Sequence, residues 1–596
     1  MRASNFVGSF LIAFLLAACQ VDPGPIEELD EIGKGGGGQS GSPIGHFIEA
    51  PRLLSGTDGL LLNGNDLWVA MSLVDAVVII DIRTGWVKRI VASEADADAT
   101  ELVVPDDFWR DPITGDIYMT QVGSGTGGHV TRIAPDGTRT RILTNYSDNN
   151  AFPNGIAGLH RPGEPVHLYI APTSFFGAKT GIFEVDVTGA TPPTLVYGAQ
   201  NGIDVYGQGL PGGGNGMVFD DAGTELFVPT TFGGKLLAID VVNHTARTVW
   251  NGSGGAAKAV YVRFTNDRTG LIYTEHSSGR LLRLDPYGAA DQLPTLVAQL
   301  EKGLDAVAIA PDGRMFTSNF IHGGIAVVKP DGSRKNLYPR SMNVPNGIAE
   351  LDDGRFAVGD TGSLAIVDPD APFGELPDRP KFFIDGDATI GVANGGGCNL
   401  YVTTFYRRNI QHYDVCASLP NVATNIVAPL TMAIPNNMVL VGSTLYVTDA
   451  VGVIWRMTVN GAAPTTAAPI AGGLAIPYGI AAHDGNIYAS EWAGNQVRVI
   501  NGTTGAPVRT ITGLEAPEGL AVEADGSVLV IESKKGVLTR VRPDGTRETV
   551  VKFLGTQIKG ILHPLTNYFA DVMLTNGGES VVITEPLSGS IREFDL

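Results

Sequence analysis

Short apolar runs separated by tight-turn pairs are the main pattern along this chain. Residues 528–531 read Val-Leu-Val-Ile, residues 537–541 read Val-Leu-Thr-Arg-Val, and Asp-Gly pairs begin at Asp484 and Asp525. Runs of this length joined by Asp-Gly or Asn-Gly turns are typical of β-hairpins. No stretch has helical periodicity, so the pattern predicts an all-β fold.

The strand pattern repeats along the chain. A Pro-x-Gly step before an apolar strand occurs at Pro153, Pro345, Pro477 and Pro517. Looser copies raise the number of repeats to twelve, with a mean step of about 47 residues, which is within the period of propeller blades. The second positions of the repeats, which we call their opening residues, are 58, 106, 154, 215, 258, 305, 346, 390, 436, 478, 518 and 571. Each repeat holds four strands and therefore predicts one four-stranded blade of a β-propeller.

Twelve blades are too many for one ring, because propellers have about four to eight. The sequence therefore predicts two tandem six-bladed β-propellers, at residues 46–333 and 334–596. An outer strand, His46–Ala50, precedes the first repeat, and the last repeat ends at Leu596 after its third strand. We expect each ring to close with its own N-terminal strand, residues 46–50 in the sixth blade and 335–338 in the twelfth, because closure removes exposed edges.

The amino-acid composition and net charge exclude a disordered chain and a nucleic-acid partner. Hydrophobic residues make up 43% of the chain and charged residues 17%, which is enough apolar material for a large core and excludes disorder for most of the chain. The 62 acidic residues exceed the 41 Lys and Arg residues, giving a formal charge of −21. Nucleic acids would repel such a protein, so we expect none as partner.

The N-terminus has the features of an export signal. Residues 1–18 carry a basic start, a short apolar run and small residues. Leu16-Ala17-Ala18-Cys19 resembles a bacterial lipobox, which implies acylation of Cys19 and a contact with the lipid bilayer. An ordinary signal with a chance cysteine is the alternative. Gln20 after the cysteine implies the outer membrane by the rule for such lipoproteins, and residues 19–45 predict a flexible, acidic and Gly-rich tether.

Two further cysteines lie in a predicted hairpin. Cys398 and Cys416 flank two strand-like runs joined by a turn centred on Arg407, which places the two cysteines opposite each other. Facing positions are close enough for a disulfide, and an exported protein meets oxidising surroundings. Two reduced thiols are the alternative. No CxxC or HExxH motif is present, so the sequence signals no zinc site.

Residues 477–500 resemble the NHL repeat through Gly479-Ile-Ala, Asp484-Gly-Asn-Ile-Tyr and Asn495-Gln-Val-Arg. More widely, residues 46–596 resemble the NHL and gluconolactonase-like (regucalcin-like) six-bladed propellers. The resemblance implies the fold. It leaves two activities open, a ligand-binding module or a metal-dependent hydrolase.

In a propeller, the start of each innermost strand lies at the same channel mouth as the turn after the second strand. Gluconolactonase-like enzymes bind one metal ion with one acidic residue, two Asn and one Asp. In the first ring this rule brings the same combination of residue types together. Gly214-Asn215-Gly216-Met217 and Leu304-Asp305 resemble two of that family's segments, although here a whole repeat, opening at Lys258, lies between them. The resemblance implies that Ca²⁺ or another divalent cation binds to Asp58, Asn154, Asn215 and Asp305.

The second ring is more acidic at the same end. Its opening residues predict a second, structural cation site at Asn346, Asn436, Glu518 and Asp571. Its turns carry Asp360, Asp449, Glu491, Glu532 and Glu585. Crowded carboxylates repel one another unless a cation or backbone donors compensate. The alternative, both for the turn acids and for the four opening residues, is a structural role in which the acids accept hydrogen bonds from neighbouring backbone N–H groups.

Other residues at the two mouths are candidates for chemistry or ligand contact. His276 and His322 resemble the general-base histidine of streptogramin lyase propellers, and exposed turn histidines are the alternative. The ligand-binding candidates are aromatic and basic side chains of the second ring, which could stack a sugar or hold a peptide: Tyr406, Arg408, Tyr478 and Trp492.

The sequence thus predicts a monomeric, lipid-anchored protein of the cell envelope. Its predicted function is to bind a protein, glycan or small ligand at the channel mouths. The alternative is a metal-dependent hydrolase of the lactonase type or a related lyase, since propellers host both classes.

Overall fold

The structure is a computed structural model of the 596-residue chain. It describes residues 45–49, 54–73, 75–92, 104–123, 127–148, 151–174, 178–230, 233–252, 259–338, 342–361, 363–370, 381–383, 389–405, 407–417, 423–552, 554 and 569–596. Within these ranges every regular element is a β-strand except one 3₁₀ turn, η2 (Asn576–Gly578), which confirms the all-β prediction. The predicted signal (1–18), the Cys19 lipid site and residues 19–44 of the tether lie outside the described residues.

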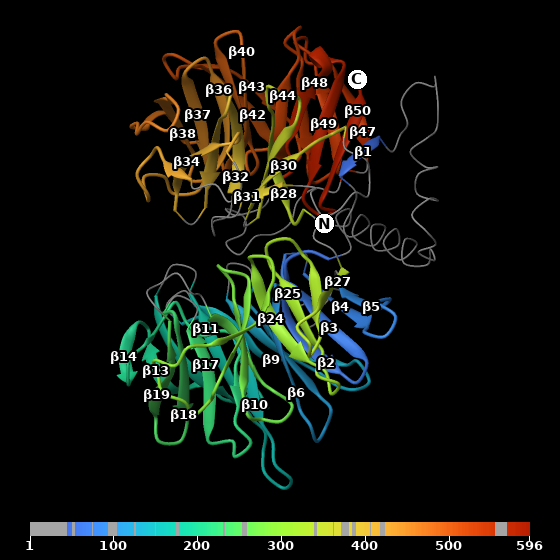
Figure 1. Ribbon diagram of the computed structural model, residues 1–596. Coiled ribbons are helices and arrows are strands. Elements are labelled where there is room, and N and C mark those ends of the chain that lie inside the picture. The colour runs from blue at the N-terminus through green and yellow to red at the C-terminus, as the bar shows by residue number, and fades with distance from the viewer. Residues whose placement is uncertain are drawn as a thin grey trace. The chain divides into compact units, whose positions relative to one another are not determined.

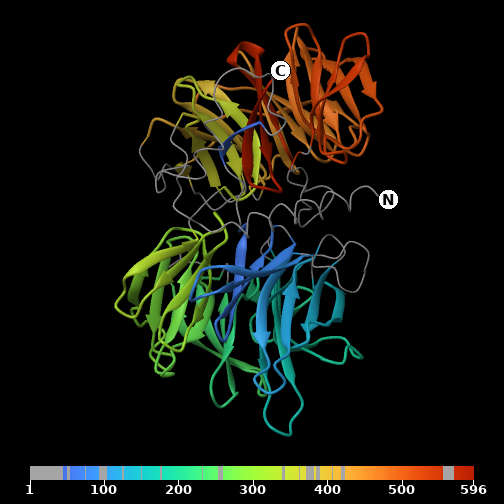
Figure 2. The same ribbon diagram turned by 90° about the vertical axis from the view of Figure 1, so that its right-hand side faces the viewer.

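The chain divides into two compact units. We call Leu54–Arg340 the N-terminal unit and Ser341–Leu596, together with the segment Met1–Leu53, the C-terminal unit. Within the described ranges each unit contains six antiparallel sheets, which follow one another in chain order (Figures 1 and 2).

The sheets of the N-terminal unit are given in hydrogen-bonded order. They are β2 (Thr57–Asn63), β3 (Asp66–Met71), β4 (Ala76–Asp81), β5 (Val87–Ala92); β6 (Pro105–Arg110), β7 (Ile117–Gln121), β8 (Gly128–Ile133), β9 (Arg139–Tyr146); β10 (Phe152–Leu159), β11 (His167–Thr173), β12 (Lys179–Val185), β13 (Thr194–Gln200), β14 (Ile203–Tyr206), with β15 (Leu210–Pro211) beside β12; β16 (Val218–Phe219), β17 (Glu225–Thr230), β18 (Lys235–Asp240), β19 (Thr245–Asn251); β20 (Ala259–Phe264), β21 (Leu271–Glu275), β22 (Arg280–Leu284), β23 (Thr295–Gln299); and β24 (Leu304–Ile309), β25 (Met315–Asn319), β26 (Ile325–Val328), β27 (Arg334–Tyr338).

The C-terminal unit is built in the same way. Its sheets are β28 (Pro345–Glu350), β29 (Phe356–Asp360), β30 (Ser363–Val367), β31 (Lys381–Phe383); β32 (Thr389–Gly396), β33 (Asn399–Thr404), β34 (Asn409–Asp414), β35 (Thr424–Asn425); β36 (Pro435–Val441), β37 (Thr444–Asp449), β38 (Val453–Thr458), β39 (Ala468–Gly472); β40 (Pro477–His483), β41 (Asn486–Glu491), β42 (Gln496–Asn501), β43 (Pro507–Thr512); β44 (Pro517–Val522), β45 (Val528–Glu532), β46 (Val537–Val541), β47 (Arg547–Lys552); and β48 (Val572–Thr575), β49 (Ser580–Glu585), β50 (Ser590–Asp595), β1 (His46–Glu49).

The hydrophobic core lies between successive sheets. Second strands such as β45 are buried along their whole length, whereas a fourth strand such as β43 is almost entirely exposed. One core cluster joins Tyr488 and Val497 of one sheet to Leu520 and Val530 of the next. Burial of both faces of a sheet explains the continuous apolar runs that the sequence shows in the second strands.

Hydroxyl groups near the ends of the second strands connect neighbouring sheets within each unit, including the last sheet with the first. The Ser72 hydroxyl donates to the Pro105 carbonyl of the next sheet at 2.7 Å. The Ser318 hydroxyl donates to the Asp58 carbonyl at 2.6 Å, joining the last sheet of the N-terminal unit to its first. The Thr584 hydroxyl donates to the Asn346 carbonyl at 2.6 Å in the C-terminal unit. Four-stranded sheets in this cyclic order are propeller blades.

The predicted closing strands are exchanged, so that prediction is wrong. β27 completes the sheet β24–β27, and β1 pairs with β50 in the last sheet (Figure 1). A tight turn after Lys329, closed by a hydrogen bond from its N–H to the Ser333 carbonyl at 2.8 Å, joins β26 directly to β27. Pairing of β27 with its neighbour β26 closes only a short loop and so costs little entropy. The last sheet, β48–β50, therefore takes its fourth strand from the distant β1. The boundary between the units consequently follows residue 340, and β1 belongs to the C-terminal unit.

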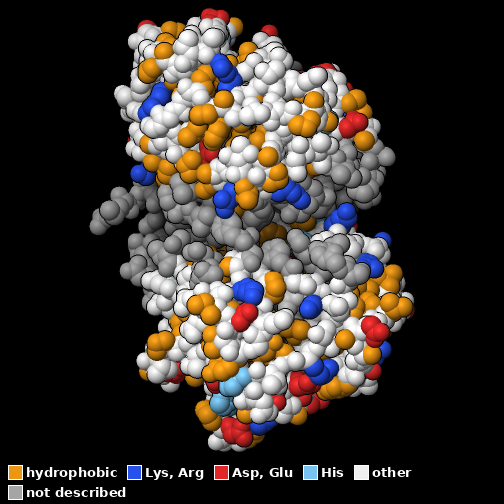
Figure 3. Space-filling view, turned by 90° about the vertical axis from the view of Figure 1, so that its left-hand side faces the viewer, with side chains coloured by type: hydrophobic (Ala, Val, Ile, Leu, Met, Phe, Trp, Pro, Cys, Tyr) orange, Lys and Arg blue, Asp and Glu red, His pale blue; other side chains and the backbone are white. Residues whose placement is uncertain are grey.

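The predicted disulfide between Cys398 and Cys416 is confirmed, with Cα atoms 5.3 Å apart. No helix in the described part of the chain is long and apolar enough to cross a membrane. On the face drawn in Figure 3, Lys and Arg side chains lie scattered among apolar and uncharged ones.

Candidate functional site

Polar residues at the start of the inner strands of the N-terminal unit lie close together. Asp58 of β2, Asp106 of β6, Asn154 of β10 and Asp305 of β24 lie at or next to the second position of their strands. Each of these strands has a β-bulge at that point, which turns the side chain out of the regular ladder. We call these four residues the acidic cage.

Glycine residues allow the inner strands to approach one another at the acidic cage. A Cβ atom on Gly59 would lie 2.1 Å from the Asp106 carbonyl oxygen, and one on Gly155 would lie 2.4 Å from the Asn215 carbonyl oxygen. This close approach explains the Asp-Gly and Asn-Gly steps that open the repeats.

The acidic cage is buried and its carboxyl groups interact. Asp58, Asp106 and Asp305 are 6%, 2% and 6% exposed. The Asn154 amide donates to Asp106 Oδ2 at 2.7 Å, and Asp58 and Asp305 share a hydrogen bond. Burial, and then the neighbouring carboxyl groups, raise the pKa values of Asp58 and Asp106 well above the ordinary range. Burial raises the pKa of Asp305 to about 7.

Three oxygen atoms of the acidic cage have no hydrogen-bond partner among the described residues. They are Asp106 Oδ1, Asn154 Oδ1 and Asp305 Oδ1. A buried oxygen without a donor costs free energy, and a cation removes that cost. An all-oxygen set of carboxylates and an amide suits a hard ion such as Ca²⁺.

The carboxylate oxygens of the acidic cage do not converge on a single point. Among the described residues, the only three His, Cys, Asp or Glu side chains with ligand atoms all within 4.8 Å of one another are Cys398, Asp414 and Cys416. Ligand oxygens around one Ca²⁺ lie within about 5 Å of one another. An ion bound by all three carboxylates of the acidic cage would therefore require a side-chain rotation.

A neutralising group lies beside the acidic cage. The Tyr261 hydroxyl donates to Asp107, the Arg263 guanidinium donates to the Tyr261 hydroxyl, and Arg263 lies over the Tyr261 ring at 4.1 Å. Asp107 also accepts hydrogen bonds from the backbone N–H groups of Phe108 and Ile156. Burial still raises the pKa of Asp107, but Arg263, Tyr261 and these backbone N–H groups oppose the shift, whereas no cation lies beside the carboxyl groups of the acidic cage among the described residues.

The predicted first-ring ligands are partly brought together. Asp58, Asn154 and Asp305 belong to the acidic cage, whereas Asn215 Oδ1 accepts a hydrogen bond from the Gly216 N–H at 2.8 Å. Asp106, not predicted as a ligand, hydrogen-bonds to Asn154 instead. Its signal in the sequence is its place at the opening of the second repeat.

The two candidate histidines lie in turns with their own partners. His276 Nδ1 lies 3.0 Å from the Leu304 carbonyl oxygen, and His322 Nε2 lies 2.7 Å from the Glu301 carboxylate. His276 thus contacts the first residue of β24, and His322 contacts the loop that precedes this strand. A general-base role for either histidine stays a prediction.

In the C-terminal unit, the predicted ligands hold the segment Phe569–Asp571. Asn346 Oδ1 accepts from the Phe569 N–H at 3.1 Å, and Glu518 Oε2 accepts from the Ala570 N–H at 2.8 Å. Asp571 Oδ2 accepts from the Asn437 amide at 2.8 Å. Asn436 donates to the Pro477 carbonyl at 2.8 Å. None of these four contacts requires an ion, and a second cation site stays a prediction.

Four of the five turn acids of the C-terminal unit bind backbone N–H groups, which confirms the alternative for those four. Asp449 accepts from the N–H groups of Ala433 and Ile434 at 2.9 Å each. Similar bonds join Asp360 to Asn343, Glu491 to Ala475 and Glu532 to Glu515, and Glu585 instead pairs with Arg592. Apart from Glu585, these acids hold the loop before the inner strand of their own blade.

The aromatic residues of the C-terminal unit form a buried cluster. Tyr478 is 0% exposed and stacks on Phe569, with ring centroids 5.4 Å apart. Trp492 packs against Tyr478 edge-on at 6.3 Å. The prediction that Tyr478 stacks a ligand is therefore wrong, because Phe569 occupies its face. Tyr406 lies outside the described residues, and Arg408 is partly exposed.

The stability of the C-terminal unit should fall as pH rises, because burial raises the pKa of Glu518 to about 8. Between its ordinary pKa of 4.5 and about 8, the folded chain keeps a proton that the unfolded chain has lost. The free energy of unfolding then decreases with pH by up to about 1.4 kcal/mol per unit. Glu518→Gln retains an acceptor for Ala570 and should flatten this dependence.

Thermal unfolding of both proteins between pH 5 and pH 8.5 is the measurement. The exposed Glu515→Gln serves as the control and should follow the wild type. Identical pH profiles for the wild type and Glu518→Gln would contradict the assignment.

A scan against protein-family models and a search of curated proteins found no match to the chain. Among solved structures, the extracellular domain of a putative one-component system from B. thetaiotaomicron is 10% identical, with 93% of this chain and 82% of that chain covered and a TM-score of 0.30. A streptogramin B lyase is 14% identical, with 58% and 95% covered and a TM-score of 0.26. Virginiamycin B lyase from Staphylococcus aureus is 16% identical, with 47% and 91% covered and a TM-score of 0.21. TM-scores this low support no conclusion about the activity of this chain. The assignment of the sheets as propeller blades is based on the strand pairing within this structure.

Proposed function

We propose that this chain is an envelope protein of two six-bladed β-propellers that binds a ligand at the channel mouth of its N-terminal unit with the help of a divalent cation. The six sheets of each unit and the hydrogen bonds from Ser318 and Thr584 back to the first sheets support the two rings. The Leu-Ala-Ala-Cys segment that ends at Cys19 supports attachment to a membrane by acylation.

The acidic cage carries the functional proposal. It combines three carboxyl groups that burial and mutual repulsion make hard to ionise with three oxygens that lack a donor among the described residues. Two other buried acids, Asp449 and Glu585, are satisfied by backbone N–H groups and by arginine, respectively. The acidic cage differs from these acids, and a cation would supply the missing positive charge.

The acidic cage also favours a second candidate, a hydrolase of the lactonase type. Asp58, Asp106, Asn154 and Asp305 would hold the ion, which when bound would polarise a carbonyl group of the substrate. Asp107, held by Tyr261 and Arg263 next to Asp106, would keep its own carboxylate away from the ion. This candidate needs a proton acceptor, which the contacts of His276 and His322 do not identify.

The test is metal analysis of the purified full-length chain together with thermal unfolding in Ca²⁺ and in EDTA. We expect about one equivalent of bound divalent metal and a higher unfolding temperature in Ca²⁺, because a ligand that binds only the folded state stabilises it. If the purified chain contains no metal and its unfolding curves in millimolar Ca²⁺ and in EDTA are the same, both the cation-dependent binding function and the hydrolase function are rejected.

A further inference from the structure

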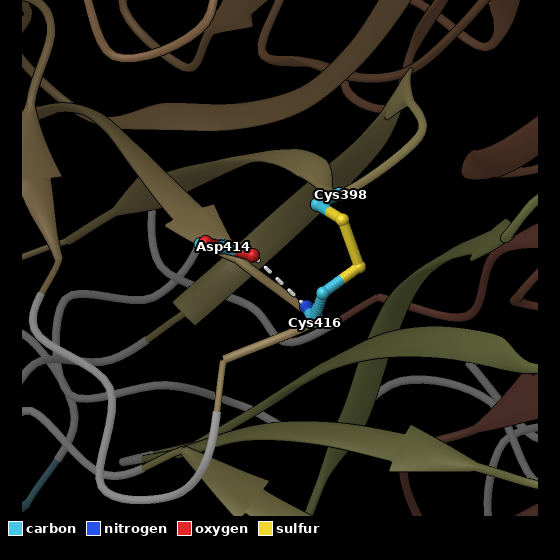
Figure 4. A group of neighbouring side chains, drawn as sticks. All are labelled: Cys398, Asp414 and Cys416. Carbon is cyan, nitrogen blue, oxygen red and sulfur yellow. Dashed lines mark hydrogen bonds between the residues drawn. A yellow bond between two sulfur atoms is a disulfide. The ribbon is translucent and has the colours of Figure 1, made fainter.

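The hairpin β33–β34 carries a second set of metal-ligating atoms, unlike the acidic cage in chemistry. The Sγ atoms of Cys398 and Cys416 and a carboxylate oxygen of Asp414 all lie within 4.8 Å of one another (Figure 4). In the structure the two sulfur atoms are joined in a disulfide. Asp414 and Cys416 are exposed, so both a reductant and a metal ion can reach them.

We propose that reduction of the Cys398–Cys416 disulfide opens a Zn²⁺ site made of the two thiolates and the Asp414 carboxylate. A dithiol reductant would donate two electrons and two protons, becoming a disulfide itself while the Cys398–Cys416 bond breaks to give two thiols. Zn²⁺ binding then releases both thiol protons to solvent, because only thiolates are ligands. The oxidised hairpin excludes the ion, since a disulfide sulfur carries no charge.

The backbone holds these ligands in place after the sulfur–sulfur bond is broken. Six consecutive residue pairs, from Asn399 opposite Asp414 to Thr404 opposite Asn409, keep β33 and β34 in register. The Val415 N–H donates to the Cys398 carbonyl at 2.9 Å, just beyond the strand ends. The two cysteines therefore stay opposite each other independently of the disulfide.

The distances fit a zinc ion. Zinc–sulfur bonds of about 2.3 Å in a tetrahedron place two sulfur atoms about 3.8 Å apart. Cα atoms 5.3 Å apart permit that spacing with a small rotation of each side chain. Asp414 Oδ1 already accepts the Cys416 N–H at 3.0 Å, which directs the carboxylate toward the sulfur atoms (Figure 4).

The ligand set selects the metal. Thiolates favour zinc and other soft ions, whereas the all-oxygen acidic cage favours hard ions, so the two sites bind different metals. Three protein ligands leave the fourth position of a tetrahedral ion to water, which suits an exchangeable site. The site therefore couples metal binding to the redox state of the surroundings.

The experiment is a titration of the full-length chain with Cd²⁺ as a probe of thiolate ligation, followed by competition with Zn²⁺. The protein is used oxidised and after anaerobic reduction with a phosphine that is then removed. We expect an ultraviolet thiolate-to-metal charge-transfer band that saturates at one ion per reduced chain and is absent from the oxidised chain. Asp414→Asn should weaken Zn²⁺ affinity about tenfold or more.

Two controls separate this site from other thiols and acids. Cys398→Ser retains Cys19 and Cys416 and should lose the saturating band, whereas Asp484→Asn, an exposed acid in another blade, should match the wild type. The proposal is overturned if the reduced chain gives no band, if Cys398→Ser gives the same band, or if reduction abolishes the β-sheet circular dichroism signal. Saturation without any effect of Asp414→Asn would remove Asp414 from the site.

Discussion

Calcium binding by the N-terminal unit should be lost when either Asp106 or Asp305 is replaced by asparagine. Each replacement keeps the shape of the side chain but removes one of three carboxylates and one oxygen that lacks a donor among the described residues. Calcium modules of extracellular proteins have dissociation constants of about 10⁻⁴–10⁻³ M, so removal of a charged ligand should move binding out of the measurable range. Isothermal titration calorimetry of the full-length chain with Ca²⁺ measures this loss.

The fold should survive these substitutions. Burial disfavours the charged forms of Asp106 and Asp305, so a neutral amide relieves that cost in the metal-free protein. Asp312→Asn is the matched control, because Asp312 lies in the exposed turn before β25 and accepts hydrogen bonds from Arg314. Calcium binding that persists in both cage variants, or that disappears only in Asp571→Asn, would place the ion outside the acidic cage.

A chain that begins at residue 54 should have a destabilised C-terminal unit. It lacks β1, which covers the outer edge of β50 from His46 opposite Glu593 to Glu49 opposite Ile591. It also loses Ile48, which is 1% exposed and packs among Met342, Ile348 and Ile591. Loss of a buried isoleucine alone costs about 2–5 kcal/mol, and the bare edge favours aggregation.

Calorimetric unfolding and light scattering of this truncated chain measure both effects. A chain that begins at residue 45 keeps β1 and serves as the control, with the same unfolding temperature expected as for the full-length chain. Melting of the N-terminal unit should be unchanged, because β27 completes its last sheet. Equal unfolding temperatures for the chains starting at residues 45 and 54 would show that β1 contributes nothing to closure.

The exchange of closing strands shows a limit of sequence patterns. Outer strands are mostly exposed, as β27 is at Arg334, Lys335 and Asn336. Their side chains therefore do not determine which strand they pair with. The short turn after Lys329 decides the pairing of β27, and the last sheet then pairs with β1. Prediction from repeat phase alone placed both strands in the wrong unit, because repeat phase does not include the entropy of loop closure.

The acidic cage could be predicted in part. Repeat phase identified Asp58, Asn154 and Asp305 as residues of one mouth, because equivalent positions of cyclic blades meet there. The partner of Asn154 could not be predicted, since Asp106 and Asn215 hold equivalent positions in the two neighbouring repeats. The structure shows that Asn154 donates to Asp106, whereas Asn215 accepts from Gly216. The contacts of Phe569 with Asn346 and Tyr478 were not predicted either, because Phe569 lies before a repeat and so falls outside the repeat pattern.

The sequence by itself determined the all-β class, the phase of the repeats and the position of the disulfide, and it offered the turn acids as backbone acceptors as one of two alternatives. These properties depend on contacts within one blade, where residues near in sequence are also near in space. Tertiary structure alone decided which strands close the sheets, which polar side chains share a mouth and which aromatic faces are covered. Those outcomes depend on contacts between distant segments, such as Ser318 with Asp58 and Tyr261 with Asp107, and chain geometry selects them only after all the blades have packed.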